Sequence, residues 1–222
     1  FSIYRFMAMI SELSVEPRHH FTFIPEDIHI PAEPLLRVQG YRDMDGVRAP
    51  IRQAAEETAA RAEKVLMPAA YVCRTDVRSC ADDVMTLVDG RAFHSTEFSK
   101  VLTGCETVFA TIVTVGTGLD DELQLCLKDD DILSALFLET AGWIAIEKAT
   151  KALRGHLTVL AQGEDHRLSR RLAPGYSDWE LTEQAVLFAL FDGVDLPIRL
   201  LDSSAMLPKM SRSGLYGLLP KT

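Results

Sequence analysis

The sequence of 222 residues has little that would bind a metal ion or a redox cluster. Its four cysteines, Cys73, Cys80, Cys105 and Cys126, include no C-x-x-C pair, and such pairs are common ligands of structural zinc and of iron–sulfur clusters. We therefore expect no metal site, and we expect reduced, structural thiols in a cytoplasmic protein. A protein of this kind must receive any electron that it uses from a separate donor.

Basic residues and long apolar runs are also scarce. The chain has 23 Lys and Arg against 32 Asp and Glu, which disfavours binding to nucleic acid through its phosphates. The apolar stretch at 132–146 is interrupted by Glu139 and is shorter than the ~20 residues of a membrane span. We expect neither a nucleic acid nor a membrane as a partner.

Several catalytic motifs are missing. No G-x-S-x-G sequence is present, which disfavours a serine hydrolase of the α/β type. Gly116-Thr117-Gly118 is followed by Asp121 where a further glycine would be expected, so the dinucleotide fingerprint is incomplete. A conventional methyltransferase with a glycine-rich loop is disfavoured for the same reason.

Length and composition fit one globular domain with a core of its own. We assign residues 21–222 to this domain and residues 1–20 to an N-terminal extension, which has no evident signal-peptide cleavage site. Apolar periodicity, capping residues and turn residues predict its elements. They are an extended segment with at most one short edge strand at 21–34, a strand or turn at 35–41, a buried central strand at 107–115, and helices at 49–66, after Ser95 or Ser99, from Gly118, at 132–153 and at 180–191. Because these elements do not repeat a β-α-β order, the predicted fold class is α+β.

The segment Arg171-Leu172-Ala173-Pro174-Gly175-Tyr176 combines a cation, a rigid turn and an aromatic ring. Arg171 can hold a carboxylate with two parallel hydrogen bonds, and Gly175 lets the backbone approach a ligand closely. Tyr176 can stack on a base or face a sulfonium cation. Carboxylate, adenine and sulfonium are the three recognisable groups of S-adenosylmethionine. The alternative is an ordinary surface turn within a basic cluster.

A second segment, at 202–216, reads D-S-S-A-M-L-P-K-M-S-R-S-G-L-Y. Its serines can bond to a ligand or to the backbone, and Gly214 leaves room for close packing. Taken alone, this segment is equally compatible with a strand and a loop held by hydroxyl groups.

Together the two segments resemble the pocket of the S-adenosylmethionine-binding activation domain of cobalamin-dependent methionine synthase. The pattern of that family reads roughly R-x-A-P-G-Y and then E-S-x-A-M-x-P-x-x-S-x-S-G-x-Y, and both halves occur here in the family's order. The resemblance implies a single domain with a twisted, mainly antiparallel sheet flanked by helices.

The resemblance also implies roles for individual residues. Arg171 would pair with the methionine carboxylate, and Tyr176 would lie near the sulfonium and the corrin as the catalytic residue. The turn would offer backbone contacts and the second segment would line the pocket. The residues concerned are Ala173, Pro174 and Gly175 in the turn, and Ser211, Ser213, Gly214 and Tyr216 in the second segment.

The implied function is that of a stand-alone reactivation subunit of a split methionine synthase. The family domain binds S-adenosylmethionine and supports the reductive methylation of inactive cob(II)alamin to methylcobalamin. The cobalamin-binding and catalytic modules would then be separate chains, and the electron would come from a flavodoxin- or ferredoxin-like donor.

Two departures from the family keep other functions open. The Asp-Trp pair that binds the amino group near the start of the family domain is absent from the first sixty residues, and the pair present is Asp178-Trp179. The sequence also ends at Thr222, before the strand that carries a tyrosine pair in the long synthases. The alternatives are an activator of another corrinoid-dependent methyltransferase and a non-catalytic scaffold that kept the fold but lost the cosubstrate.

Overall fold

The computed structural model describes residues 18–26 and 28–221. Its main sheet has seven strands in the order β4-β3-β2-β5-β9-β6, with β1 paired to β2, and its pairings are antiparallel. The strands are β1 (Arg18–Phe23), β2 (Ala69–Ala81), β3 (Val84–Leu87), β4 (Ala92–His94), β5 (Thr107–Thr114), β6 (His166–Leu168) and β9 (Ser211–Pro220), and a separate hairpin is formed by β7 (Arg199–Leu200) and β8 (Met206–Leu207). The predicted α+β class and the antiparallel sheet are confirmed.

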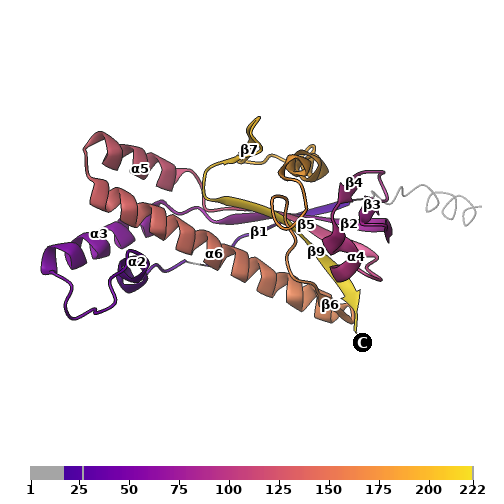
Figure 1. Cartoon of the computed structure of the whole chain (residues 1–222), viewed down its shortest axis with the longest axis horizontal. Coiled ribbons are helices and arrows are strands. Elements are labelled where there is room, and N and C mark those ends of the chain that lie inside the picture. Colours follow the sequence, from indigo (N-terminus) through magenta and orange to yellow (C-terminus); the bar gives the residue numbers. More distant parts are fainter. Residues whose placement is uncertain (1–17, 27, 222) are drawn as a thin grey trace, which may run out of the picture.

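Helices lie on both faces of the sheet and form one end of the molecule (Figure 1). The longest helix, α6, runs along the sheet and continues beyond it, where it packs with the other helices of that end. The helices are α2 (Ala32–Val38), α3 (Ala49–Val65), α4 (Thr96–Val101), α5 (Gly118–Lys128), α6 (Ile132–Gly163) and α7 (Gln184–Phe188).

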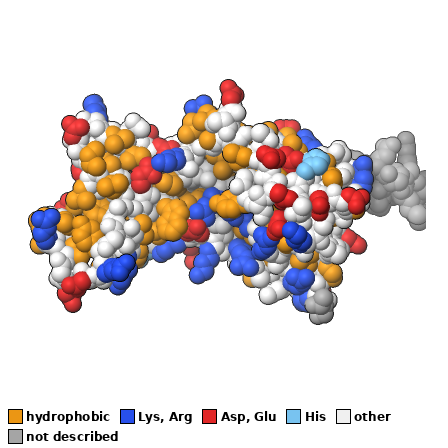
Figure 2. Space-filling view, viewed as in Figure 1, with side chains coloured by type: hydrophobic (Ala, Val, Ile, Leu, Met, Phe, Trp, Pro, Cys, Tyr) orange, Lys and Arg blue, Asp and Glu red, His pale blue; other side chains and the backbone are white. Residues whose placement is uncertain are grey.

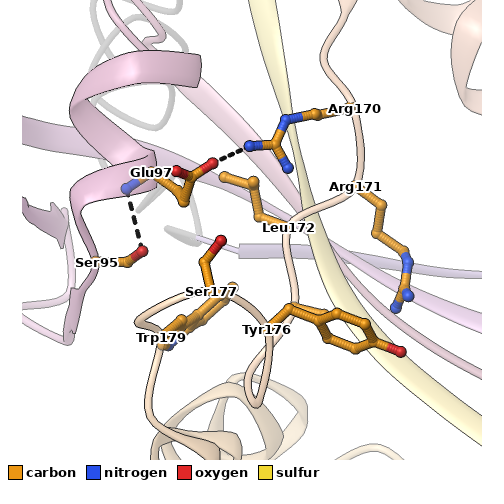
Figure 3. A pocket seen from close by; sticks show the side chains of 9 residues that line it. Ser95, Glu97, Arg170, Arg171, Leu172, Tyr176, Ser177 and Trp179 are labelled. Carbon is orange, nitrogen blue, oxygen red and sulfur yellow. Dashed lines mark hydrogen bonds and ion pairs between the residues drawn. The ribbon is translucent and has the colours of Figure 1, made fainter.

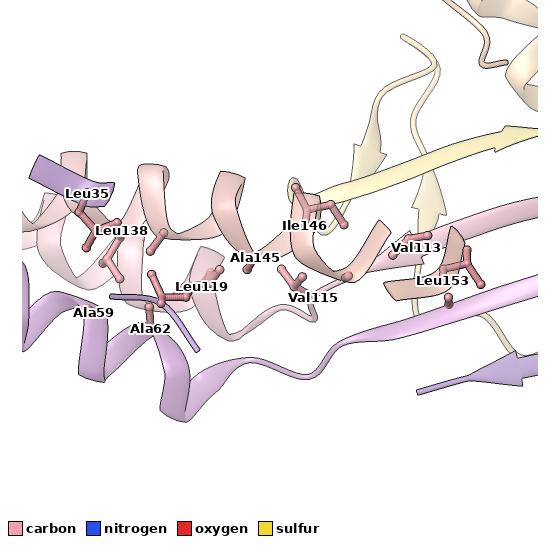
Figure 4. Packing of buried hydrophobic residues seen from close by; sticks show 14 of the residues in the cluster. Leu35, Ala59, Ala62, Val113, Val115, Leu119, Leu138, Ala145, Ile146 and Leu153 are labelled. Atoms are coloured by element: carbon pink, nitrogen blue, oxygen red, sulfur yellow. The ribbon is translucent and has the colours of Figure 1, made fainter. Parts of the chain in front are cut away.

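The helix predicted from Ile132 is confirmed, and it continues past its predicted end at Leu153 to Gly163. Asp131 caps its start by accepting a hydrogen bond from the backbone N–H of Ser134 at 3.1 Å, which satisfies one free donor of the first turn. Figure 4 shows buried side chains of α6 packed between the other helices and β5. This helix therefore joins the helical end to the sheet in one core.

The outward face of α6 is partly apolar. Ile132, Leu136 and Trp143 are all exposed and share one side of the helix because their spacing matches its period. Apolar side chains gather at the helical end in Figure 2, and many of the charged side chains lie toward the sheet end. Among the described residues no helix is long and apolar enough to cross a membrane.

The buried central strand predicted at 107–115 is β5, which lies between β2 and β9. Its side chains alternate between two core clusters, with Phe109 and Val113 on the α6 side and Ile112 on the other. The neighbouring β9 alternates in the same way, so Leu215 and Tyr216 belong to opposite clusters. The two faces of the sheet are thus both covered.

The strand or turn predicted at 35–41 is wrong, because the structure has α2 there. Leu35 and Leu36 are both fully buried, and a helix can place two adjacent side chains on its buried side, whereas a strand would turn one of them outward. Pro34 is tolerated in the first turn, and Gly40, with φ of 94°, follows the end of the helix.

The other predicted elements are confirmed to different degrees. The helix predicted at 49–66 is α3, with Pro50 in its first turn, and the edge strand is β1, which begins at Arg18. Ser95, and not Ser99, caps α4 by accepting from the Glu97 N–H at 3.1 Å. The helix predicted at 180–191 is broken into 3-10 turns at Leu181–Glu183 and Ala189–Phe191 on either side of α7.

Candidate functional site

The first motif segment lies directly against β9. Leu172 and Leu215 exchange two backbone hydrogen bonds, with N···O distances of 2.9 and 2.7 Å, and the Ser169 hydroxyl accepts from the Gly217 N–H at 2.9 Å. Gly214 allows this approach, because a Cβ added there would lie 2.8 Å from the Leu172 carbonyl oxygen. The two segments that carry the resemblance are therefore neighbours in the folded chain.

The Pro-Gly turn is held in one conformation by the residues that follow it. Gly175 has φ of 83°, a value that favours glycine, and its N–H donates to the Trp179 carbonyl at 2.8 Å. Trp179 is buried against Phe93 and Phe98 in edge-to-face contacts and donates its indole N–H to Glu183 at 2.8 Å. A buried tryptophan thus anchors a turn whose other side is open to solvent.

Arg171 and Tyr176 face each other across this turn. The guanidinium carbon of Arg171 lies 5.7 Å from the centre of the Tyr176 ring, and one guanidinium nitrogen donates to the Ser213 carbonyl at 2.6 Å. Figure 3 shows the two side chains next to one another, while Arg170 points the other way, toward α4. Tyr176 is 66% exposed, so its ring is available to a ligand.

Two cavities meet at this pair. The first, which we call the Glu97 cavity, has a volume of about 320 Å³; the second, the Ser213 cavity, has about 340 Å³. Both are lined by Arg171, Ala173 and Tyr176. The Glu97 cavity adds Ser95, Glu97, Arg170, Leu172, Ser177 and Trp179, and the Ser213 cavity adds Pro174, Leu181, Gln184, Ser203, Ser204, Ala205, Met206, Ser211, Arg212 and Ser213.

The Glu97 cavity carries charges of both signs. Arg170 is bonded to the Glu97 carboxylate, and Lys100 lies 3.2 Å from the same group. Lys100 and then Arg170 hold the pKa of Glu97 below its usual value, so this carboxylate is ionised at neutral pH. Arg170, Lys100 and Glu97 therefore form an ion-paired cluster in a cavity that Arg171 also lines.

The lining of the Ser213 cavity includes four serines, and one buried amide bonds to two of them. Gln184 accepts from the Ser213 hydroxyl at 2.9 Å and donates to the Ser204 carbonyl at 2.8 Å. Gln184 is only 3% exposed and Ser213 is only 5% exposed, so the bond between them is shielded from water. This amide ties the 203–206 loop to β9.

The structure brings together most of the predicted site residues but places Tyr216 apart. Arg171, Ala173, Pro174, Tyr176, Ser211 and Ser213 line the cavities, Gly175 shapes the turn, and Gly214 admits the first segment. Tyr216 is 1% exposed and belongs to the core cluster on the α6 side. Burial raises the pKa of its hydroxyl. Its predicted contact with a ligand remains a prediction.

Other lining residues were missed by the sequence reasoning. Glu97, Gln184 and Trp179 come from segments that the two motifs do not include, and only the fold brings them to the site. The Asp178-Trp179 pair was noticed in the sequence, and the structure uses its carboxylate to hold α4. Asp178 accepts from the Ser95 hydroxyl at 2.6 Å and from the Thr96 N–H at 3.0 Å.

The four cysteines are free thiols, and burial raises the pKa of Cys73 and Cys105 to about 11. Within the described part of the chain, no group of three or more His, Cys, Asp or Glu residues could hold a metal ion.

Comparison with solved structures identifies the architecture. The MetH reactivation domain, in a crystal structure bound to AdoHcy, superimposes with a TM-score of 0.62 over 92% of this chain and 79% of the other, at 16% sequence identity. The chain has the fold of the MetH reactivation domain. No family model and no curated protein matches the sequence. At this identity the likeness to the MetH reactivation domain shows the fold, and the residues of the site must be judged by their own geometry.

Proposed function

We propose that this chain binds S-adenosylmethionine and acts as a stand-alone reactivation subunit of a split cobalamin-dependent methionine synthase. The observation that carries this proposal is the pairing of Arg171 with Tyr176 at the junction of the two cavities. The MetH reactivation domain, whose fold the chain shares, is described as bound to AdoHcy, the product that S-adenosylmethionine leaves when it gives up its methyl group.

The residues present fit the chemical groups of the ligand. Arg171 offers its planar donors to the carboxylate of the methionine part. Glu97, which is bonded to Arg170 and Lys100, would accept from the ammonium group of the ligand by giving up one of these exposed bonds. The exposed Tyr176 ring suits the sulfonium cation, because the ring face attracts positive charge. The Ser213 cavity, which combines serines with apolar side chains, suits the ribose and adenine.

In the proposed reaction the chain binds and orients one cosubstrate. S-adenosylmethionine supplies a methyl group and leaves as S-adenosylhomocysteine, while one electron comes from a flavodoxin- or ferredoxin-like donor. Together they convert cob(II)alamin, held by a partner chain, to methylcobalamin. The chain's own part is to fix the methionine end through Arg171 and to keep the sulfonium beside the open face of Tyr176.

Calorimetric titration of S-adenosylmethionine into the full chain tests the binding step. We expect saturable binding that Arg171→Ala weakens by about 2 kcal/mol, roughly 30-fold, because a charged hydrogen-bonded pair is lost. Tyr176→Ala should weaken it by about 1 kcal/mol, at little cost to stability because the ring is exposed. Arg167→Ala is the matched control, since Arg167 is an exposed arginine of β6, and it should bind like the parent.

A second experiment tests reactivation itself. A cobalamin-loaded methionine synthase that lacks its own activation domain is mixed with this chain, S-adenosylmethionine and reduced flavodoxin, and methylcobalamin is followed by its absorption spectrum. Formation of methylcobalamin that depends on this chain supports the proposal. Binding of S-adenosylmethionine without formation of methylcobalamin favours an activator of another corrinoid-dependent methyltransferase. If the chain neither binds S-adenosylmethionine nor supports formation of methylcobalamin, the scaffold alternative is favoured.

A further inference from the structure

A separate apolar cavity lies where β2 begins and β5 ends. It has a volume of about 500 Å³ and is lined chiefly by apolar side chains, among them Ile24, Met67, Tyr71, Pro197 and Pro208. Met67 is 72% exposed and Ile24 is 64% exposed, so two large apolar side chains stand at the rim of a hollow that is itself apolar. Concave apolar surface of this kind is typical of a binding site.

A second cavity, with two carboxylates in its lining, adjoins the apolar one. It has a volume of about 410 Å³, most of its lining residues are apolar, and its charged residues are Asp120 and Asp121 of α5 and Arg199 of β7. The two cavities share Thr117, Pro197 and Pro208, so they adjoin each other, and we call the pair the docking groove. In Figure 1, α5 and the hairpin that contains β7 lie on the same side of the molecule.

The two carboxylates of the docking groove differ in their hydrogen bonds and exposure. Asp120 accepts from the backbone N–H of Lys209 at 2.9 Å, which leaves its second oxygen for a ligand, and Asp121 is exposed. Burial, and then the charge of Asp195, raise the pKa of the Tyr71 hydroxyl, so this hydroxyl is neutral in the apolar cavity that it lines. The charged side chains that line the groove are therefore the carboxylates of Asp120 and Asp121 and the guanidinium of Arg199.

We propose that the docking groove binds an extended segment of a partner protein that carries a large apolar side chain followed by Lys or Arg. The apolar side chain enters the cavity between Met67 and Tyr71, and the basic side chain meets Asp120 and Asp121. The groove and the segment would complement each other in both apolar surface and charge. Binding of such a segment does not depend on the proposed function, because the groove is lined by residues outside the two S-adenosylmethionine cavities.

Peptide titrations on the full chain test this assignment. The probe is a fluorescein-labelled peptide, Gly-Ser-Leu-Trp-Arg-Arg-Gly, and the readouts are fluorescence anisotropy and the NMR shifts of ¹³C-labelled Met and Ile methyl groups. We expect saturable binding with a Kd below about 1 mM and shifts at Met67 and Ile24. A peptide with Glu in place of both Arg residues should bind at least about 10-fold more weakly.

Matched variants separate the two halves of the groove. Met67→Ala and Asp121→Asn should each weaken the probe at least about 3-fold, and both sites are exposed, so folding should be unaffected. Val159→Ala and Asp129→Asn change an exposed valine of α6 and an exposed aspartate after α5, and both should bind like the parent.

Three results would overturn the assignment. The first is an absence of methyl shifts at Met67 and Ile24 at millimolar probe. The second is equal binding of the Arg and Glu peptides. The third is a change of the same methyl signals with protein concentration alone, which would mean that a second copy of this chain occupies the groove.

Discussion

Gly214 and Leu172 lie so close together that a Cβ on Gly214 would be 2.8 Å from the Leu172 carbonyl oxygen. The same Cβ would be 2.9 Å from Cγ of Arg171. This contact is where the first motif segment rests on β9, so it links the backbone of the sheet to the side chain that we assign to the ligand carboxylate.

Gly214→Ala should therefore displace the segment that carries Arg171. We expect a loss of about 1–3 kcal/mol in the free energy of unfolding, as for other overpacked positions, together with weaker binding of S-adenosylmethionine. Urea unfolding and calorimetry measure the two effects. The control is Gly155→Ala in α6, where nothing lies within 4 Å of the added Cβ and where alanine should stabilise by about 0.5–1 kcal/mol. Unchanged stability and binding in Gly214→Ala would contradict the expected displacement.

Gln184→Leu should release the 203–206 loop. The variant leaves the Ser213 hydroxyl and the Ser204 carbonyl without their partner, which should cost about 1–3 kcal/mol of unfolding free energy. Denaturant unfolding measures this loss, and Gln124→Leu on the exposed side of α5 should change it by less than about 0.5 kcal/mol.

A double-mutant cycle makes the Gln184 prediction specific. Ser213→Ala should cost less in the Gln184→Leu background than in the parent, because the hydroxyl has already lost its acceptor. Equal costs in the two backgrounds would mean that the bond between Ser213 and Gln184 contributes nothing to stability.

Asp178 should make the protein sensitive to acid. Hydrogen bonds from the Ser95 hydroxyl and from Thr96 lower its pKa to about 2, below the usual value of an aspartate. A depressed pKa in the folded state contributes stability that is present above the unfolded pKa and is lost as the pH falls through the folded pKa. Thermal unfolding midpoints should therefore fall more steeply between pH 4 and about 2 in the parent than in Asp178→Asn. Parallel pH profiles would count against this role for the carboxylate.

The sequence was informative wherever a local pattern decided the structure. The β-branched run at 107–115 fits a buried strand, and the amphipathic spacing at 49–66 fits a helix. Ser95 and Ser99 both have the side chain of a helix cap, and the structure decided between them. The pattern failed at Leu35 and Leu36, because two adjacent apolar residues next to prolines carry no clear period. Packing against α3 and α6 buries both side chains in a helix, and this packing depends on residues far along the chain.

Some features of the candidate site follow from the local sequence, and others follow only from the tertiary structure. The sequence by itself determined the cation, the turn and the ring of 171–176, since Pro174, Gly175 and Tyr176 restrict or permit their own backbone conformations and side-chain chemistry. Only the tertiary structure decided which residues complete the cavities. Glu97, Trp179 and Gln184 reach the site from α4, the turn that follows the first motif, and α7, while Tyr216 is turned into the core by the alternation of β9. Such placements depend on the pairing of distant strands and the packing of helices, which act between residues that no local pattern connects.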